Sequence, residues 1–337
     1  MKKKQLKAQE SSSLELKSKI APSPEAFLTL LLATVSAAVA LVMLITNKYV
    51  FPFGNTLLAP MLGQMIALLI PTYLFLQLTS YGKRPRVLLG ELGCKKIGAE
   101  HIFFLVFTAL FMISTSFVLN TLFYGIYKAS EGFTILGIFT AGVNEYTVSM
   151  PYIILVYAAV PAVIEEFMFR GVIYSGLSKI STPIAVIGSS LISAIFAFTL
   201  GGFPAAAFCA LGFCFVRYIT GSLFSCIIVH FVFNLYGLFL QTNLSKYLLS
   251  QQNDVMLLAV TLVVWLICLI LFFSECAHIF RERSKNIAEG KEKSKIIKFD
   301  IERLKEDALS ILAHKPSLAC AIVLLLLFAA VTVIGFI

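Results

Sequence analysis

The chain has 337 residues, of which 59% are hydrophobic and 13% are charged, and its formal net charge is +9. Soluble globular domains average about 45–50% apolar and about 25% charged residues, so this composition excludes that class. It predicts an all-α polytopic bundle of membrane-spanning helices. The seven cysteines include no Cys-x-x-Cys motif and lie mostly in apolar stretches. This indicates small core residues rather than a disulfide framework or a thiolate zinc site.

Nine stretches are apolar and long enough to cross a bilayer. In chain order, the predicted spans cover about residues 27–45, 57–79, 101–124, 151–173, 184–200, 203–219, 222–240, 255–275 and 317–337. The first span follows a polar, basic tail without a convincing cleavage site, so we expect an uncleaved helix rather than a signal peptide. The weakest divisions between spans are at Gly201-Gly202 and around Thr220-Gly221.

The basic residues are distributed unevenly between the two sides of this arrangement. If the N-terminus is cytoplasmic, 23 of the 27 Lys and Arg residues fall on the cytoplasmic side. Lys48, Lys128 and Lys246 fall on the opposite side, and Arg170 lies within the membrane. The positive-inside rule therefore predicts nine spans with a cytoplasmic N-terminus. Contact with anionic lipid is sufficient to explain the net charge, so no nucleic-acid partner is expected.

The order of these stretches predicts six parts. They are a basic cytoplasmic tail (1–26), N-terminal transmembrane helices (27–149), a core with polar motifs (150–240), an additional transmembrane helix (241–277), a basic cytoplasmic linker (278–315) and a C-terminal transmembrane helix (316–337). Two interpretations of residues 278–315 stay open, because alternating charges and scattered isoleucines and leucines fit either an amphipathic surface helix or a solvated linker.

Three ionisable residues interrupt the fourth predicted span. Glu165, Glu166 and Arg170 lie in a run that is otherwise apolar, and each such group costs several kcal/mol to insert at bilayer depth. Glu166 and Arg170 are i, i+4 neighbours on a helix and can form an ion pair. Glu165 lies about 100° further round the helix and is left without that partner, which suits a general base. The alternative is a structural ion pair that anchors one helix to another.

A second polar pair lies in the seventh predicted span. His230 and Asn234 are i, i+4 neighbours and share a helix face. Counted from the cytoplasmic side at about 1.5 Å per residue, His230 and Glu165 are both roughly 12 Å deep. This common depth predicts one site built from both helices. A buried His–Asn pair that bridges helices is the alternative interpretation.

Residues 150–240 resemble the CPBP family of intramembrane proteases, also called the Abi or CAAX protease family, which includes the type II CAAX prenyl endopeptidases. The resemblance rests on three motifs in this order: Glu165-Glu166-x-x-x-Arg170, Gly212-x-x-x-x-Arg217-x-x-Thr220-Gly221-Ser222-Leu223 and His230-x-x-x-Asn234. It implies a helical bundle around a polar site and endopeptidase activity on a membrane-associated peptide or protein. It also implies that Glu165 activates water, while His230 and Asn234 bind a metal ion or stabilise the oxyanion.

One position departs from the family pattern. The family carries Phe-x-x-x-His on the helix after the glutamates, and here Leu200 occupies the position of the histidine. Glu165 and His230 are the candidate ligands of a divalent metal such as zinc. The whole set of donors, with Glu166 and Asn234, is poor by the standards of protein zinc sites.

Two functions from different classes follow from this pattern. The first is an intramembrane endopeptidase, with Glu165, Glu166, Arg170, His230 and Asn234 as its site residues, in a multi-pass protein of a bacterial plasma membrane. The second is a catalytically degenerate relative that binds a peptide or a partner membrane protein in the same place. The retained polar residues favour the protease, whereas the leucine at position 200 favours the binding protein. A transporter is a distant third, because the core pattern is not repeated elsewhere in the chain.

Overall fold

The computed structural model describes residues 24–49, 58–79, 83–122, 150–198, 203–238, 255–290 and 300–336. Every regular element in these ranges is helical, which confirms the predicted all-α class. The elements are α2 (Pro24–Tyr49), α3 (Leu58–Gln64), η2 (Met65–Leu69), α4 (Ile70–Thr79), α5 (Pro85–Glu91), η3 (Ala99–His101), α6 (Ile102–Leu122), α9 (Met150–Ile154), η5 (Leu155–Ala159), α10 (Val160–Glu166), η6 (Phe167–Ile173), α11 (Tyr174–Leu177), α12 (Thr182–Ile195), α13 (Phe203–Thr220), α14 (Leu223–Tyr236), α16 (Val255–Ala288), α17 (Ile301–Ala313) and α18 (Lys315–Phe336).

Seven helical stretches in the described ranges are long and apolar enough to cross a membrane. They are Ala26–Met43, Met61–Thr79, Ala99–Leu119, Met150–Leu177, Phe203–Thr220, Ala259–Ala288 and Lys315–Thr332. Two shorter apolar helices, α12 and α14, occupy the predicted positions of the fifth and seventh spans. Each has 14 residues and rises about 21 Å, less than the about 30 Å of a hydrocarbon core.

The fifth predicted span ends earlier than expected. The sequence predicts a continuous helix to residue 200, but α12 ends at Ile195. The next three residues form a turn that leaves the helical path, and Phe198 adopts a positive φ of 51°. Leu200 itself lies outside the described residues.

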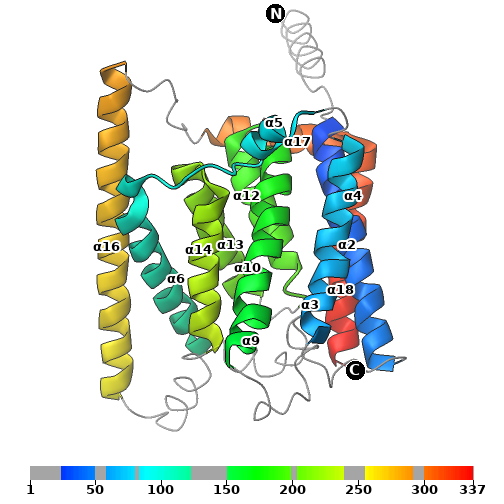
Figure 1. Ribbon diagram of the computed structural model, residues 1–337, viewed down its shortest axis with the longest axis horizontal. Coiled ribbons are helices and arrows are strands. Elements are labelled where there is room, and N and C mark those ends of the chain that lie inside the picture. The colour runs from blue at the N-terminus through cyan, green and yellow to red at the C-terminus, as the bar shows by residue number, and fades with distance from the viewer. Residues whose placement is uncertain are drawn as a thin grey trace, which may run out of the picture.

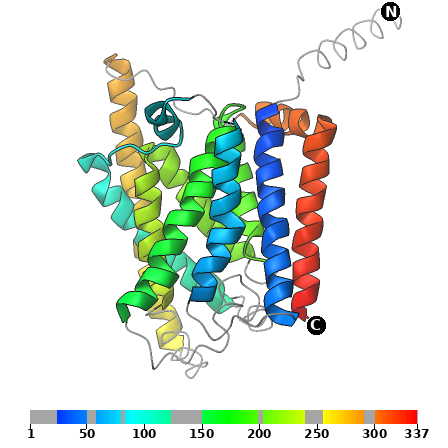
Figure 2. The same cartoon turned by 45° about the vertical axis from the view of Figure 1, so that its right-hand side comes forward.

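The bundle has a central group of helices, with the pair α6 and α16 on one side and the pair α2 and α18 on the other (Figure 1). Helices α10, α12, α13 and α14 form the centre (Figure 1), while α2 and α18 lie side by side at one edge in both views (Figure 2). Buried side chains from α2, η6, α12 and α18 make one apolar core. A second core joins α6, α13, α14 and α16, where the rings of Phe104 and Phe272 are 6.4 Å apart.

The stretch 278–315 is largely helical where the structure describes it. Helix α16 continues to Ala288, so the predicted boundary between residues 277 and 278 falls inside a helix. Helix α17 begins after Asp300, whose carboxylate accepts the backbone N–H groups of Glu302 and Arg303. Its residues Leu304, Ala308 and Ile311 are spaced for one face and pack against the first core. Residues 301–313 thus match the amphipathic helix rather than the solvated linker.

The described basic segments gather at one end of the bundle. Helices α5 and α17 lie at the same end (Figure 1), and the basic residues of 83–96 and 301–315 flank or belong to them. This is the arrangement on which the positive-inside prediction depends, although the direction of insertion stays a prediction.

We expect this end to face the cytoplasm. In a variant without the natural cysteines, Lys83→Cys and Arg283→Cys should be shielded from a membrane-impermeant thiol reagent in intact cells. A Lys246→Cys variant should react, because the sequence predicts this residue, which lies outside the described ranges, on the opposite side. Labelling of the first two variants in unbroken cells would overturn the predicted topology.

Candidate active site

The span that carries both glutamates is one continuous helix with two widened, π-helical segments. It runs through α9, η5, α10, η6 and α11. Pro161 lies in the first turn of α10, directly after η5. A proline has no backbone N–H to donate to the preceding turn, which is a common reason for a local change in helix pitch. Glu165 and Glu166 end α10, and Arg170 follows within η6, so the polar residues occupy the junction between the two types of turn.

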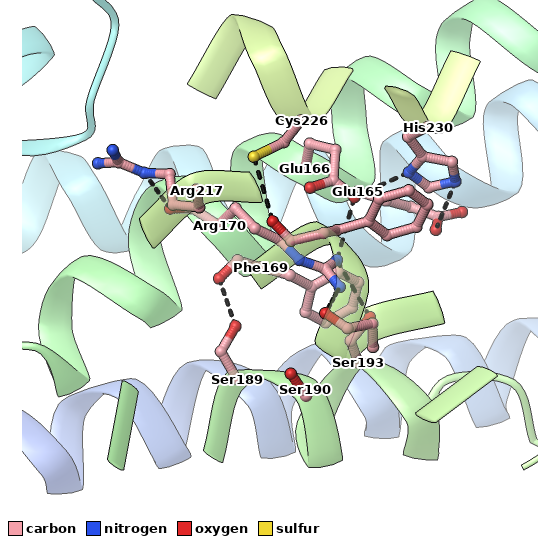
Figure 3. A network of polar contacts seen from close by, with 12 residues as sticks. Glu165, Glu166, Phe169, Arg170, Ser189, Ser190, Ser193, Arg217, Cys226 and His230 are labelled. Carbon is pink, nitrogen blue, oxygen red and sulfur yellow. Dashed lines mark hydrogen bonds and ion pairs between the residues drawn. The ribbon is translucent and has the colours of Figure 1, made fainter. Parts of the chain in front are cut away.

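Glu166 and Arg170 form a buried ion pair. Arg170 Nη1 donates to Glu166 Oε1 at 3.1 Å, and the two side chains are 0% and 1% exposed, respectively. Arg170 also donates to Ser193 Oγ at 3.3 Å and, through Nη2, to the Ala210 carbonyl at 2.9 Å (Figure 3). The guanidinium lies 5.1 Å from the centre of the Phe213 ring. Three helices therefore converge on this cation, and the predicted i, i+4 pair is present.

His230 joins the two glutamates into a single cluster. Its Nδ1 is 2.8 Å from Glu166 Oε1, and its Nε2 is 4.0 Å from Glu165 Oε2 (Figure 3). The ring is stacked on Phe213 with a centroid distance of 4.5 Å, which fixes its plane. An ionised carboxylate only accepts hydrogen bonds, so Nδ1 must carry the proton toward Glu166. The structure thus brings together the two polar sites that a common depth predicted.

Glu165 differs from Glu166 in its surroundings. Its side chain is 30% exposed, whereas Glu166 is fully buried. Glu165 has Gln64 and His230 as polar neighbours, while the direct contact of Arg170 is with Glu166. The separation of 4.0 Å between Glu165 Oε2 and His230 Nε2 is too long for a direct hydrogen bond and is suited to a bridging water. Glu165 is therefore the carboxylate of the pair that remains available for proton transfer.

Asn234 lies one turn beyond His230 on α14 and reaches the backbone of the glutamate-bearing helix. Its Nδ2 donates to the Ala158 carbonyl at 3.3 Å. Ala158 belongs to the widened segment η5, where the backbone hydrogen-bond pattern is shifted. An amide nitrogen has two N–H groups, so this bond leaves one for another acceptor.

Two polar partners of the cluster were not predicted from the sequence. Gln64 Nε2 donates to Glu165 Oε1 at 3.2 Å, and Ser193 accepts from Arg170. Gln64 carries a readable signal, because it is an uncharged polar residue deep in the second apolar span. Ser193 carries none, since serines are common in transmembrane helices and only the fold shows which of them faces Arg170.

Arg217 belongs by sequence to the cytoplasmic charges, but the structure turns it inward. It is 8% exposed, its Nε donates to the Arg170 carbonyl at 3.4 Å, and its Nη1 donates to the Gly221 carbonyl. The guanidinium also lies 5.6 Å from the centre of the Tyr174 ring. Arg217 thus joins the end of α13 to the helix that carries the glutamates, which gives a physical reason for an arginine in the Thr-Gly-Ser-Leu motif.

The loop after α5 packs against Arg217 and is hydrogen-bonded to the start of α14. The Gly93 carbonyl accepts the Leu223 backbone N–H at 2.8 Å, and Ser222 Oγ donates to the Lys95 carbonyl at 2.6 Å. Gly93 has φ +79°, a conformation that favours glycine, and a Cβ at this position would overlap the Arg217 guanidinium. A residue outside the core segment therefore helps to define the start of α14.

Gly93→Ala should destabilise the protein more than a matched glycine substitution. Gly290 has a similar φ of +70°, and a Cβ at that position would meet no atom within 4 Å, so Gly290→Ala tests backbone strain alone. We expect about 1–2 kcal/mol for Gly290→Ala, and about 1–3 kcal/mol more for Gly93→Ala because Arg217 must move. The free energy of unfolding in mixed micelles measures both. Equal losses would show that the contact with Arg217 is unimportant.

The described residues offer few ligands for a zinc ion. A catalytic zinc usually has three protein ligands at about 2.0–2.2 Å, and no group of three or more His, Cys, Asp or Glu residues within the described ranges is placed to hold a metal. Glu166 is neutralised by Arg170, which leaves Glu165 and His230 as the donors. Leu200 falls outside the described residues, so its departure from the family pattern stays a prediction from the sequence.

Comparison with known proteins identifies the central part of the chain. Residues 147–236 match the family described as type II CAAX prenyl endopeptidase Rce1-like. No curated protein and no solved structure matches the chain significantly. The matched stretch contains both glutamates, Arg170, His230 and Asn234, and it leaves the flanking helices outside. The resemblance read from the motifs is thereby confirmed: residues 147–236 form an Rce1-like domain of the CAAX protease family.

Proposed function

We propose that the protein is an intramembrane endopeptidase that hydrolyses a peptide bond in a membrane-associated peptide or protein. The observation that carries this proposal is the unequal environment of the two glutamates. Arg170 neutralises Glu166 at 3.1 Å, while Glu165 faces His230 Nε2 across 4.0 Å and keeps a carboxylate oxygen available. An ion pair with a purely structural purpose needs only one carboxylate, so the second, partly exposed one calls for another role.

In the proposed reaction, Glu165 acts as a general base and then as a general acid. It removes a proton from a water held between Glu165 and His230, and the resulting hydroxide attacks the carbonyl carbon of the scissile bond. The carbonyl oxygen becomes an oxyanion, which N–H groups of His230 and Asn234 stabilise. The C–N bond then breaks, and the proton held by Glu165 passes to the leaving amine. The products are one carboxylate and one amine, as hydrolysis requires.

His230 can donate to the oxyanion only as an imidazolium, because Nδ1 already faces Glu166 at 2.8 Å. Glu166 therefore has two tasks in the proposal: it balances Arg170 and it holds the His230 ring. A zinc ion held by Glu165 and His230 remains a prediction from the sequence, and no step depends on it.

The second candidate is a degenerate relative that binds a peptide without cleaving it. Leucine at the position of the family's second-motif histidine favours this candidate. It predicts a stable complex with an intact peptide, whereas the protease predicts two fragments.

The proposal is tested with purified protein in vesicles that contain anionic lipid. The probe is a farnesylated peptide that ends in Cys and three further residues, because CAAX prenyl endopeptidases are the matched family. The same peptide without the farnesyl group tests whether a lipid anchor is needed, and added zinc or a chelator tests the metal. We expect one new carboxyl terminus in the mass spectrum, absent with Glu165→Gln. Intact peptide recovered bound to the wild-type protein would favour the degenerate relative.

A further inference from the structure

Gln64 contacts Glu165 from outside the domain that matches the protease family. It is the last residue of α3, it is 4% exposed, and its Nε2 donates to Glu165 Oε1 at 3.2 Å. Helix α3 packs beside η5 and α10, which carry Ala158 and Glu165. The matched domain begins at residue 147, so the Rce1-like segment alone lacks this partner of the proposed base.

The chemistry of the contact fixes the orientation of the Gln64 amide. An ionised carboxylate only accepts hydrogen bonds, so the amide NH₂ group must face Glu165 and the amide oxygen must face away from it. That oxygen is buried and has no hydrogen-bond partner among the described residues.

A π-helical segment adjoins Gln64, as such segments do on the helix that carries the two glutamates. The widened segment η2 begins at Met65, directly after Gln64. The segments η5 and η6 flank the two glutamates on the opposing helix. Such π-helical turns are rare and occur often at functional sites, where they re-aim a side chain.

We propose that Gln64 is a positioning residue for Glu165. The proposal rests on the proposed peptide hydrolysis: Gln64 holds one oxygen of the base through its N–H, so that the other oxygen faces His230. Glu165 is partly exposed and lacks a direct pair with Arg170, so without Gln64 its carboxylate has more freedom to rotate. The helix that precedes the family domain thus completes the site.

The test compares Gln64→Met with two variants that alter the hydrogen bond differently. Met keeps the length and removes the donor, Gln64→Glu keeps the shape and replaces the donor by an acceptor, and Gln64→His restores an N–H. The matched control is Gln77→Met, because Gln77 is an exposed glutamine further along the same span. The readouts are kcat and KM per folded molecule on the farnesylated peptide. A second readout is the unfolding midpoint of Gln64→Met and Glu165→Ala, singly and together.

We expect Gln64→Met and Gln64→Glu to lower kcat about ten-fold to a hundred-fold, with KM within about two-fold, since a hydrogen bond to a charged group is lost. Gln64→His should recover part of kcat, and Gln77→Met should match the wild type. Gln64→Met and Glu165→Ala should together lower the unfolding midpoint by less than the sum of their single effects, because the two residues share one hydrogen bond.

The outcomes test the role of Gln64 and the proposed peptide hydrolysis separately. An active wild type with unchanged kcat in Gln64→Met overturns the role of Gln64 and leaves the protease proposal standing. A wild type that cleaves nothing overturns the protease proposal. In that case non-additive midpoints still support Gln64 as the residue that holds Glu165, and additive midpoints overturn that contact too.

Discussion

Glu165→Gln is expected to lower the cleavage rate by about 10²–10⁴-fold while the protein still folds. Glutamine has almost the same shape as glutamate, and its amide oxygen can still accept the bond from Gln64 that the structure shows at 3.2 Å. It cannot take a proton from water at the pH of the reaction. Glu165 is 30% exposed, and its carboxylate is not the one that Arg170 contacts, so removing its charge leaves the Glu166–Arg170 pair intact.

The control for this substitution is Glu91→Gln, which changes an exposed carboxylate on α5 that pairs with Lys83 instead of the cluster. It should leave the rate unchanged. Expression level and unfolding midpoint are measured for both variants, so that a loss of rate is not mistaken for a loss of folded protein. If Glu165→Gln keeps full activity while Glu166→Gln folds and is inactive, the roles assigned to the two glutamates are reversed.

Glu166→Gln is expected to cost about 3–5 kcal/mol of folding free energy. Arg170 is 1% exposed, and the substitution leaves its cation without the carboxylate at 3.1 Å. The same change takes the charged partner from His230 Nδ1 at 2.8 Å. Folded yield after extraction and the free energy of unfolding in mixed micelles measure the effect.

The exposed ion pair Lys83–Glu91 supplies the comparison. Its charged atoms are 2.7 Å apart, against 3.1 Å in the buried pair, but its side chains are 37% and 44% exposed. Removing that pair with Glu91→Gln should cost about 0–1 kcal/mol. A Glu166→Leu/Arg170→Met double variant removes both buried charges and should be more stable than Glu166→Gln, since no unpaired charge remains. Equal costs for Glu166→Gln and Glu91→Gln would contradict the buried pair.

The helices and the ion pair could be predicted from the sequence because both depend on local spacing. Apolar runs of sufficient length identify spans, and the four-residue separation of Glu166 and Arg170 places them on one helix face. The common depth of Glu165 and His230 followed from helix rise alone, and the structure brings them within 4.0 Å. These signals need no knowledge of which helices are neighbours.

The remaining features depend on tertiary neighbours and could not be read in this way. Gln64 reaches Glu165 across 101 positions of sequence, and only the packing of α3 against α10 makes that contact. Arg217 has the composition of a cytoplasmic charge, yet the Arg170 and Gly221 carbonyls draw it inward. The end of α12 at Ile195 was missed because the apolar run continues beyond it without a helix-breaking residue until Gly201.

The proposed proteolysis is tested most directly by asking whether the wild-type protein turns over a membrane-anchored peptide. In water enriched in oxygen-18, the farnesylated peptide is incubated in vesicles with protein in sub-stoichiometric amount, and the products are weighed by mass spectrometry. We expect more product molecules than protein molecules, with one oxygen-18 atom in each new carboxylate, and no product from Glu165→Gln. Intact peptide that stays bound to the wild type, with no labelled carboxylate, would contradict it.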